Sequence, residues 1–168
     1  VQLVIIKIKK KYKYFMNNIY LGIYNNLIKL TRNKNLYNTS KEDTFYDRLI
    51  IFFFHLSIIL KVYKDIETKE NLQKFFDFCI KQIELSIREI GYGDATINKK
   101  MKDYVNILFS IIDKIDNWDI LKNQQKAKII NNFKEDTSKC DFYIKYFDNF
   151  NNFVSNNTFN SLSKDIIS

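Results

Sequence analysis

Apolar residues recur every three or four positions along most of the chain, the spacing of one face of an α-helix. The pattern is clearest over residues 72–90, 97–115 and 142–153, and weaker stripes cover residues 121–133 and 19–36. No strand-like alternation of apolar and polar residues competes with it. The pattern predicts an all-α fold, a single-domain irregular helical bundle of five or six helices. Short loops are expected near residues 38–43, 65–69, 91–96, 116–119 and 135–139.

The segment DRLIIFFFHLSIILKVYK, residues 47–64, is apolar on nearly every side. Its uninterrupted part, Leu49–Leu60, has 12 residues, whereas a helix that crosses a bilayer needs about 20. We therefore expect no transmembrane helix here. Two interpretations stay open: a central helix buried on several sides, or a helix with one face open to an apolar client. His55 lies in this run, where a hydrogen-bonded core histidine is commoner than a catalytic one.

The basic residues are concentrated at the N-terminal end. The chain has 168 residues, about one domain's worth, and a formal net charge of +8. Residues 1–41 hold nine basic residues and no acid, which leaves 18 basic against 19 acidic residues in the remainder. Such a region attracts polyanions, either nucleic acid or anionic lipid head groups. We expect a basic N-terminal arm over residues 1–16, which need not belong to the domain because Met16 is an alternative start, then a helical domain (17–155) and a polar flexible tail (156–168).

Few residues are suited to catalysis or metal binding. The two cysteines, Cys79 and Cys140, form no Cys-x-x-Cys pair and there is one histidine, so no zinc site is expected. This usage favours a reducing compartment. A Cys–His nucleophile would need His55 beside one of these cysteines and a third, orienting group. Glu84 and Glu89 are five residues apart and do not share a helical face. We expect no enzyme, no catalytic residue, no metal and no cofactor.

The rarest residue types gather in the stretch LSIREIGYGDATINKKMKDY, residues 85–104. The whole chain has three arginines, three glycines and two alanines, yet Arg88, Gly91, Gly93 and Ala95 lie within eight consecutive positions. Gly91 follows a long helical stripe and suits the left-handed residue that ends a helix. Gly93 permits a second tight turn. These residues predict a hinge between two long helices, the second capped by a polar side chain. The candidates for this cap are Asp94, Thr96 and Asn98.

Three lysines, Lys99, Lys100 and Lys102, crowd the expected first turn of the second helix. The positive end of the helix dipole lies there, so each exposed cation costs about 0.3–1 kcal/mol. Two explanations stay open: internal pairing with Glu89 and Asp94, or compensation by an acidic partner.

Two blocks of this sequence resemble the ubiquinol–cytochrome c chaperone family. The run from Ile87 to Asp94, followed by Lys99-Lys100-Met101-Lys102, is similar to the family signature Leu-Arg-Glu-Met-Gly-Val-Gly-Asp and its basic cluster. The second block gives Asp43, Thr44 and Arg48, then an apolar run into His55. Phe76 with Asp77, and Glu84, fit upstream of the signature. The resemblance spans roughly Leu36 to Val154, and the arm and the tail have no match.

The chain departs from the family pattern at three places. Asp47 stands where the family usually has glycine, and Ile50 stands where an acidic residue is common. The family's C-terminal Arg-Asn-Val-Tyr-like motif is at best Asn131-Asn132-Phe133.

The resemblance implies a non-catalytic assembly chaperone that binds newly made cytochrome b during assembly of respiratory complex III. It also implies a small helper subunit, and the basic arm would hold the protein near a ribosome or an anionic membrane surface. The expected setting is the mitochondrial matrix or the bacterial cytoplasm, at the inner membrane, with no small-molecule substrate. The alternative is a basic helical nucleic-acid (RNA)-binding module, whose affinity would fall steeply with salt.

Within this interpretation, Arg88, Asp94 and Asp43 are predicted to form a structural knot that ties the two blocks together. The other motif residues expected to have structural roles are Arg48, His55, Glu89, Gly91 and Gly93. Lys99, Lys100 and Lys102, together with Tyr92, are predicted to face outward and bind a partner.

Overall fold

The computed structural model describes residues 2–37, 43–134 and 138–164, with side chains from residue 6 onward. These residues form six α-helices and three 3₁₀ helices without a strand, so the all-α prediction is confirmed. The elements are α1 (Gln2–Thr31), η1 (Lys34–Leu36), α2 (Phe45–Tyr63), α3 (Lys69–Glu89), α4 (Asp94–Ile115), η2 (Trp118–Ile120), α5 (Asn123–Asn131), α6 (Cys140–Ser155) and η3 (Asn160–Ser163).

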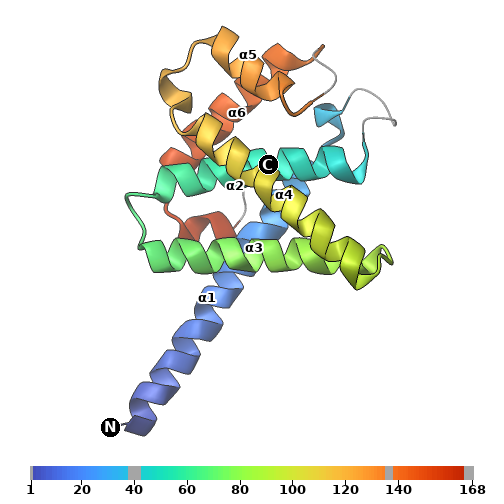
Figure 1. Cartoon of the computed structure of the whole chain (residues 1–168). Helices are drawn as coiled ribbons and strands as arrows, with labels where there is room; N and C mark the ends of the chain where they lie inside the picture. The colour runs from blue at the N-terminus through green and yellow to red at the C-terminus, as the bar shows by residue number, and fades with distance from the viewer. Residues whose placement is uncertain (1, 38–42, 135–137, 165–168) are drawn as a thin grey trace.

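Helix α2 lies at the centre of the molecule, packed against α1, α4 and α6 (Figure 1). Every residue of Leu49–Ile59 is buried. Phe54 stacks on Phe147 of α6 with ring centroids 5.0 Å apart, and Phe52 meets Tyr24 of α1 at 5.5 Å. The apolar run is therefore a core helix, and its alternative role as a client-binding face is wrong because the protein's own helices cover it.

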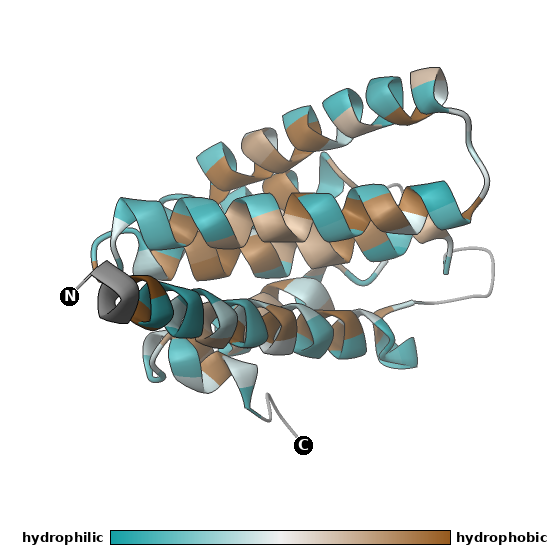
Figure 2. Cartoon of the chain, turned by 90° about the horizontal axis from the view of Figure 1, so that it is seen from below, coloured by the Kyte–Doolittle hydropathy of each residue, from teal (hydrophilic) through white to brown (hydrophobic). Residues whose placement is uncertain are grey.

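The other long helices are amphipathic, with one apolar face and one polar face. Figure 2 shows hydrophobic residues mostly on the inward sides of the long helices and hydrophilic residues on the outward sides. On α3 the buried positions recur at three- and four-residue steps. They are Leu72, Phe75, Cys79, Ile83 and Ile87. Among the described residues, no helix is both long and apolar enough to cross a membrane.

The N-terminal arm and the start of the domain are one continuous helix, α1, which projects from the body (Figure 1). Side chains 6–15 are exposed, and burial begins at Met16. Lysine is a good helix former, so the basic run does not interrupt the helix even though it interrupts the apolar stripe. The predicted helix over residues 19–36 therefore begins earlier and ends at Thr31.

The segment that follows α6 packs against the body as far as Lys164, although a flexible tail was predicted here. Phe159 and Leu162 are buried. Asn26 of α1 donates hydrogen bonds to the carbonyl oxygens of Leu162 (2.9 Å) and Lys164 (2.6 Å). A Cβ atom added to Gly22 would lie 2.8 Å from the carbonyl oxygen of Ser163. The prediction failed because two apolar residues in a polar context carry no periodic signal.

Candidate functional site

The turn between α3 and α4 is built by Gly91 and spanned by Arg88. Gly91 has φ +99°, which favours glycine, and its N–H donates to the carbonyl of Arg88 at 2.9 Å. The guanidinium donates to Glu84 Oε1 from Nε (3.0 Å) and Nη2 (2.9 Å), and to Asp94 Oδ1 from Nη1 (2.5 Å). These hydrogen bonds lower the pKa of Glu84, with a further contribution from Lys81. The predicted contact between Arg88 and Asp94 is therefore present.

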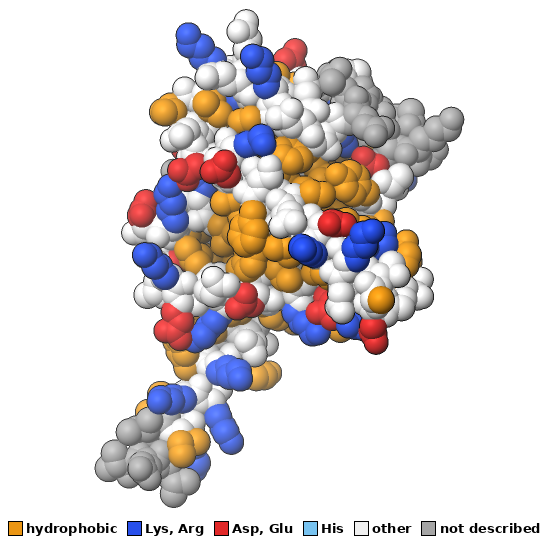
Figure 3. Space-filling view, in the orientation of Figure 1, with side chains coloured by type: hydrophobic (Ala, Val, Ile, Leu, Met, Phe, Trp, Pro, Cys, Tyr) orange, Lys and Arg blue, Asp and Glu red, His pale blue; other side chains and the backbone are white. Residues whose placement is uncertain are grey.

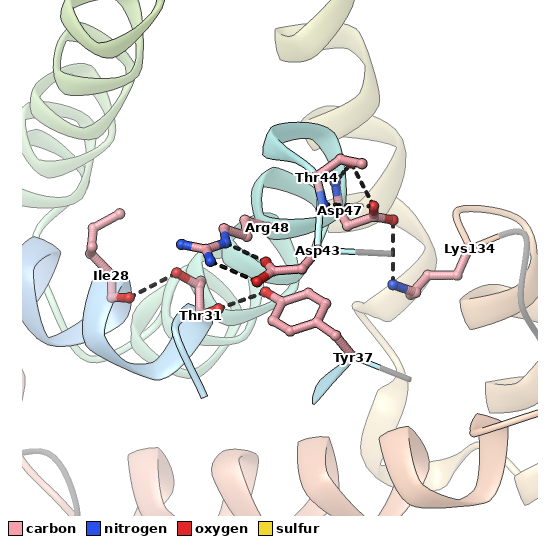
Figure 4. A network of polar contacts seen from close by, with 8 residues as sticks. All are labelled: Ile28, Thr31, Tyr37, Asp43, Thr44, Asp47, Arg48 and Lys134. Carbon is pink, nitrogen blue, oxygen red and sulfur yellow. Dashed lines mark hydrogen bonds and ion pairs between the residues drawn. The ribbon is translucent and has the colours of Figure 1, made fainter. Parts of the chain in front are cut away.

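Asp43, in contrast, does not join Arg88. It accepts two hydrogen bonds from Arg48, one from Nε to Oδ1 (2.5 Å) and one from Nη2 to Oδ2 (2.8 Å), as Figure 4 shows. The hydrogen bond from Arg48 lowers the pKa of Asp43. The prediction that Arg88, Asp94 and Asp43 form one knot is therefore wrong. Each arginine is instead paired with carboxylates close to it in sequence.

The first turn of α2 is fixed by a capping box and a buried lysine. Thr44 Oγ1 accepts from the N–H of Asp47 (3.2 Å), and Asp47 Oδ2 accepts from the N–H of Thr44 (3.2 Å). Asp47 Oδ1 also lies 3.6 Å from Nζ of Lys134, which is buried near the rings of Tyr37 and Tyr143. Asp47, which replaces the family's glycine, therefore ties the start of α2 to the segment after α5.

The end of α1 adjoins this network (Figure 4). Tyr37 donates its hydroxyl to the carbonyl of Thr31 at 2.6 Å, and Thr31 donates to the carbonyl of Ile28 at 2.8 Å. Arg48 lies between Asp43 and this end of α1. The arrangement binds structural elements together and presents no acid–base pair to a substrate.

His55 is a satisfied core residue. It is fully buried, Nδ1 lies 2.7 Å from the carbonyl of Ile51, and Nε2 lies 2.8 Å from the hydroxyl of Tyr146. A carbonyl only accepts, so Nδ1 carries the proton and Nε2 accepts from Tyr146. Burial lowers the pKa of His55 to about 4. Cys79 is fully buried and the pKa of its thiol is raised by desolvation, so neither residue is placed for nucleophilic chemistry.

An exposed apolar surface lies where α3 and α4 diverge. Figure 3 shows hydrophobic side chains gathered on this face, with charged ones around them. Phe76 of α3 stacks on Phe109 of α4, with centroids 5.7 Å apart and planes at 18°, and 54% of Phe109 is exposed. Ile80 and Ile112, one turn along each helix, are only partly buried. We name these four residues the α3–α4 apolar face.

Sequence reasoning missed this surface, although Phe109 carries a signal for it. Phe109 falls outside the periodic stripe of α4, in which Leu108, Ile111 and Ile115 are the buried positions. An aromatic residue outside the stripe must point away from the core.

Both blocks lie in residues 39–129, the segment that matches the Ubiquinol-cytochrome C chaperone family. This match covers more than half of the chain. The chain belongs to the ubiquinol-cytochrome c chaperone family.

A solved structure extends the likeness beyond the matched segment. The crystal structure of the Cbp3 homolog from Brucella abortus superposes with a TM-score of 0.76 at 19% sequence identity, over 95% of this chain and 92% of that chain. At this identity the likeness shows the fold, including α1 and α6 outside the matched segment. No protein with a curated description matches the chain.

The lysine cluster of this family member begins after the first turn of α4. The helix starts at Asp94 with Gly93 as its N-cap, and no side chain caps it, so the prediction of a polar capping side chain is wrong. Lys99 and Lys102 are exposed, and Lys100 Nζ lies 4.7 Å from the ring centroid of Tyr92. Asp94 therefore lies at the positive end of the helix dipole. The three lysines lie beyond the first turn, so their repulsion by the dipole is weaker than predicted.

Glu89, the remaining motif residue, is exposed, and among the described residues no ion pair joins it to the three lysines. Lys99, Lys102 and Tyr92 are accordingly open to a partner.

Proposed function

We propose that this member of the family is a non-catalytic assembly chaperone that binds newly made cytochrome b during assembly of respiratory complex III. Family membership supports the chaperone role, and the α3–α4 apolar face carries the proposal for how a client is bound. A half-exposed aromatic ring, Phe109, that stacks on a partly buried one, Phe76, offers an apolar surface to another apolar helix.

The client would pack along the α3–α4 apolar face rather than on α2, which is covered. The exposed ring of Phe109 and the partly buried ring of Phe76 supply rigid contact area at a small cost in side-chain entropy. Lys99 and Lys102, near the start of the same α4, would pair with acidic groups on the client or on a helper subunit and set the orientation of the complex.

The chemistry of the buried residues supports a non-catalytic role. His55 is held neutral in the core and Cys79 is inaccessible. Within residues 2–37, 43–134 and 138–164, no three histidine, cysteine or acidic side chains are grouped as a metal site would require.

The projecting part of α1 supports a second contact. Lys7, Lys9, Lys10, Lys11 and Lys13 are all exposed there. Exposed apolar side chains lie between them, among them Ile8 and Tyr12, each 62% exposed. We propose that this part of α1 keeps the chaperone at an anionic surface, either a membrane or ribosomal RNA. The alternative function, an RNA-binding module, rests on the same lysines and predicts RNA binding that needs no client.

The decisive experiment is co-purification of cytochrome b with tagged wild-type protein and with Phe109→Ser. The variant should lose most of the recovered client while losing only about 0.5–1.5 kcal/mol of stability, the value of one aromatic pair. Ile120→Ser is the matched control, because Ile120 is 81% exposed on η2, away from the α3–α4 apolar face.

Recovery of equal amounts of client by Phe109→Ser and wild type would refute the docking face. Normal assembly of complex III in a strain that lacks the protein would refute the function itself.

A further inference from the structure

A cleft of about 360 Å³ opens between α1, α2 and α3, on a part of the surface distinct from the α3–α4 apolar face. This volume lies within the range of small-molecule sites. Its apolar lining is largely buried core surface. These lining residues are Tyr24, Ile28, Phe45, Leu49, Phe52 and Ile83, of which Phe45 is exposed and Ile28 is partly buried.

One end of the cleft carries two of the chain's three arginines, Arg32 at the end of α1 and Arg48 in the second turn of α2. Among the described residues, Arg32 has no ion pair or hydrogen-bonded acid. Arg48 binds Asp43 through Nε and Nη2, and within the described part of the chain no hydrogen bond involves its Nη1. Figure 4 shows this third nitrogen on the side of Ile28, away from Asp43.

The two ends of the cleft differ in character. Tyr24 and Arg32 are eight residues apart on α1, a separation of about 12 Å along a helix axis. Near Tyr24 the lining is buried and apolar, and this burial raises the pKa of the phenol. An anion is therefore favoured at the arginine end and disfavoured at the Tyr24 end.

We propose that this cleft binds a single-chain amphiphile whose head group is an anion, a fatty carboxylate or the phosphate monoester of a single-chain lipid. The head lies between Arg32 and Nη1 of Arg48, where planar guanidinium groups suit carboxylate and phosphate oxygens. The chain runs over Ile28, Leu49 and Ile83 toward Tyr24. This site is distinct from the α3–α4 apolar face, because no residue of that face lines it.

Calorimetric titration of the full chain tests the site with decanoate, decyl phosphate, decanol and acetate, each below its micelle concentration. Decanoate or decyl phosphate should bind, and the stronger of the two identifies the head group. Decanol, which lacks the anion, and acetate, which lacks the chain, should each bind at least tenfold more weakly.

Arg32→Gln removes a charge from an exposed position and should weaken binding of the anionic amphiphile about tenfold. Arg88→Gln is the matched control and should bind as wild type does, because Arg88 does not line the cleft. Ser86→Phe adds a ring to the lining at the Tyr24 end and should reduce binding of decanoate without changing that of acetate. Equal affinity for decanol and decanoate, unaltered binding by Arg32→Gln, or equal losses in the two arginine variants would overturn the proposal.

Discussion

The hydroxyl of Tyr146 lies 2.8 Å from Nε2 of His55, and this contact joins α6 to the central helix through a neutral imidazole. Protonation of His55 would put a proton on Nε2, so this nitrogen could no longer accept the hydrogen bond from Tyr146. It would also leave a positive charge in the core.

The free energy of unfolding should therefore decrease as the pH falls below about 6.5. The pKa of His55 is about 4 in the folded protein and about 6.5 in the unfolded chain. Below pH 6.5 the unfolded chain binds a proton that the folded protein excludes, so the free energy of unfolding falls by about 1.4 kcal/mol per pH unit until about pH 4. Urea titrations between pH 7 and pH 4.5 measure this slope. His55→Gln should flatten it, and an unchanged slope in that variant would show that another group is responsible.

Arg48→Ala should lower the melting temperature more than Arg88→Ala. Arg48 makes two parallel hydrogen bonds to Asp43, whose side chain is 28% exposed. Arg88 bonds Glu84, which is 24% exposed and one turn away on the same helix, and Asp94, which is 82% exposed. Pairs four residues apart on one helix and exposed pairs each contribute little to stability. Differential scanning calorimetry on both variants gives the comparison. An equal or larger loss for Arg88→Ala would mean that the α3–α4 turn contributes more to stability than its exposure indicates.

Replacement of Lys99, Lys100 and Lys102 by glutamate should leave the melting temperature unchanged or slightly raised. The three side chains lie on the N-terminal half of α4, where negative charge complements the helix dipole, and the packing lost includes that of Lys100 on Tyr92. Partner recovery in the same pull-down should fall, and it should recover in a charge-preserving variant with arginine at the three positions. Undiminished recovery with the glutamates would remove these lysines from the interface.

Asp148→Ala should cost about 2 kcal/mol, because it leaves two buried donors without an acceptor. Asp148 Oδ1 accepts from Trp118 Nε1 and from Lys126 Nζ, each at 2.7 Å. Trp118 is the one tryptophan of the chain, so its fluorescence reports the site directly. The emission should shift to the red in the folded variant as water reaches the indole, whereas Asp113→Ala, on an exposed position of α4, should leave both readouts unchanged.

Much of the fold could be predicted from periodicity, since the stripes over 72–90 and 97–115 became α3 and α4 with small changes at their ends. The ion pairs of the site were harder to predict, because pairing depends on where the charged ends of the side chains lie in space. Arg88 has carboxylates four residues before and six residues after it, and Asp43 has Arg48 five residues after it. Local partners were thus available to both, and these local pairs formed in place of the predicted long-range contact between Arg88 and Asp43.

The surfaces were harder still. The sequence shows that α2 is apolar on all sides. It does not show which helices cover those sides, because that depends on how the other helices pack around α2. Phe109 could have been recognised from its position outside the stripe of α4, but its partner Phe76 lies inside the stripe of α3 and carries no such mark. Trp118, Lys126 and Asp148 come from three separate segments, and nothing in their spacing brings them together.

The contact between Gly22 and Ser163 has a consequence for synthesis on the ribosome. Helix α1 is held by residues made about 140 positions later in the chain, so its surface around Gly22 stays uncovered until η3 has been synthesised. The packing of α1 against η3 can form only after η3 has left the exit tunnel, and until then α1 is incompletely held in the nascent chain.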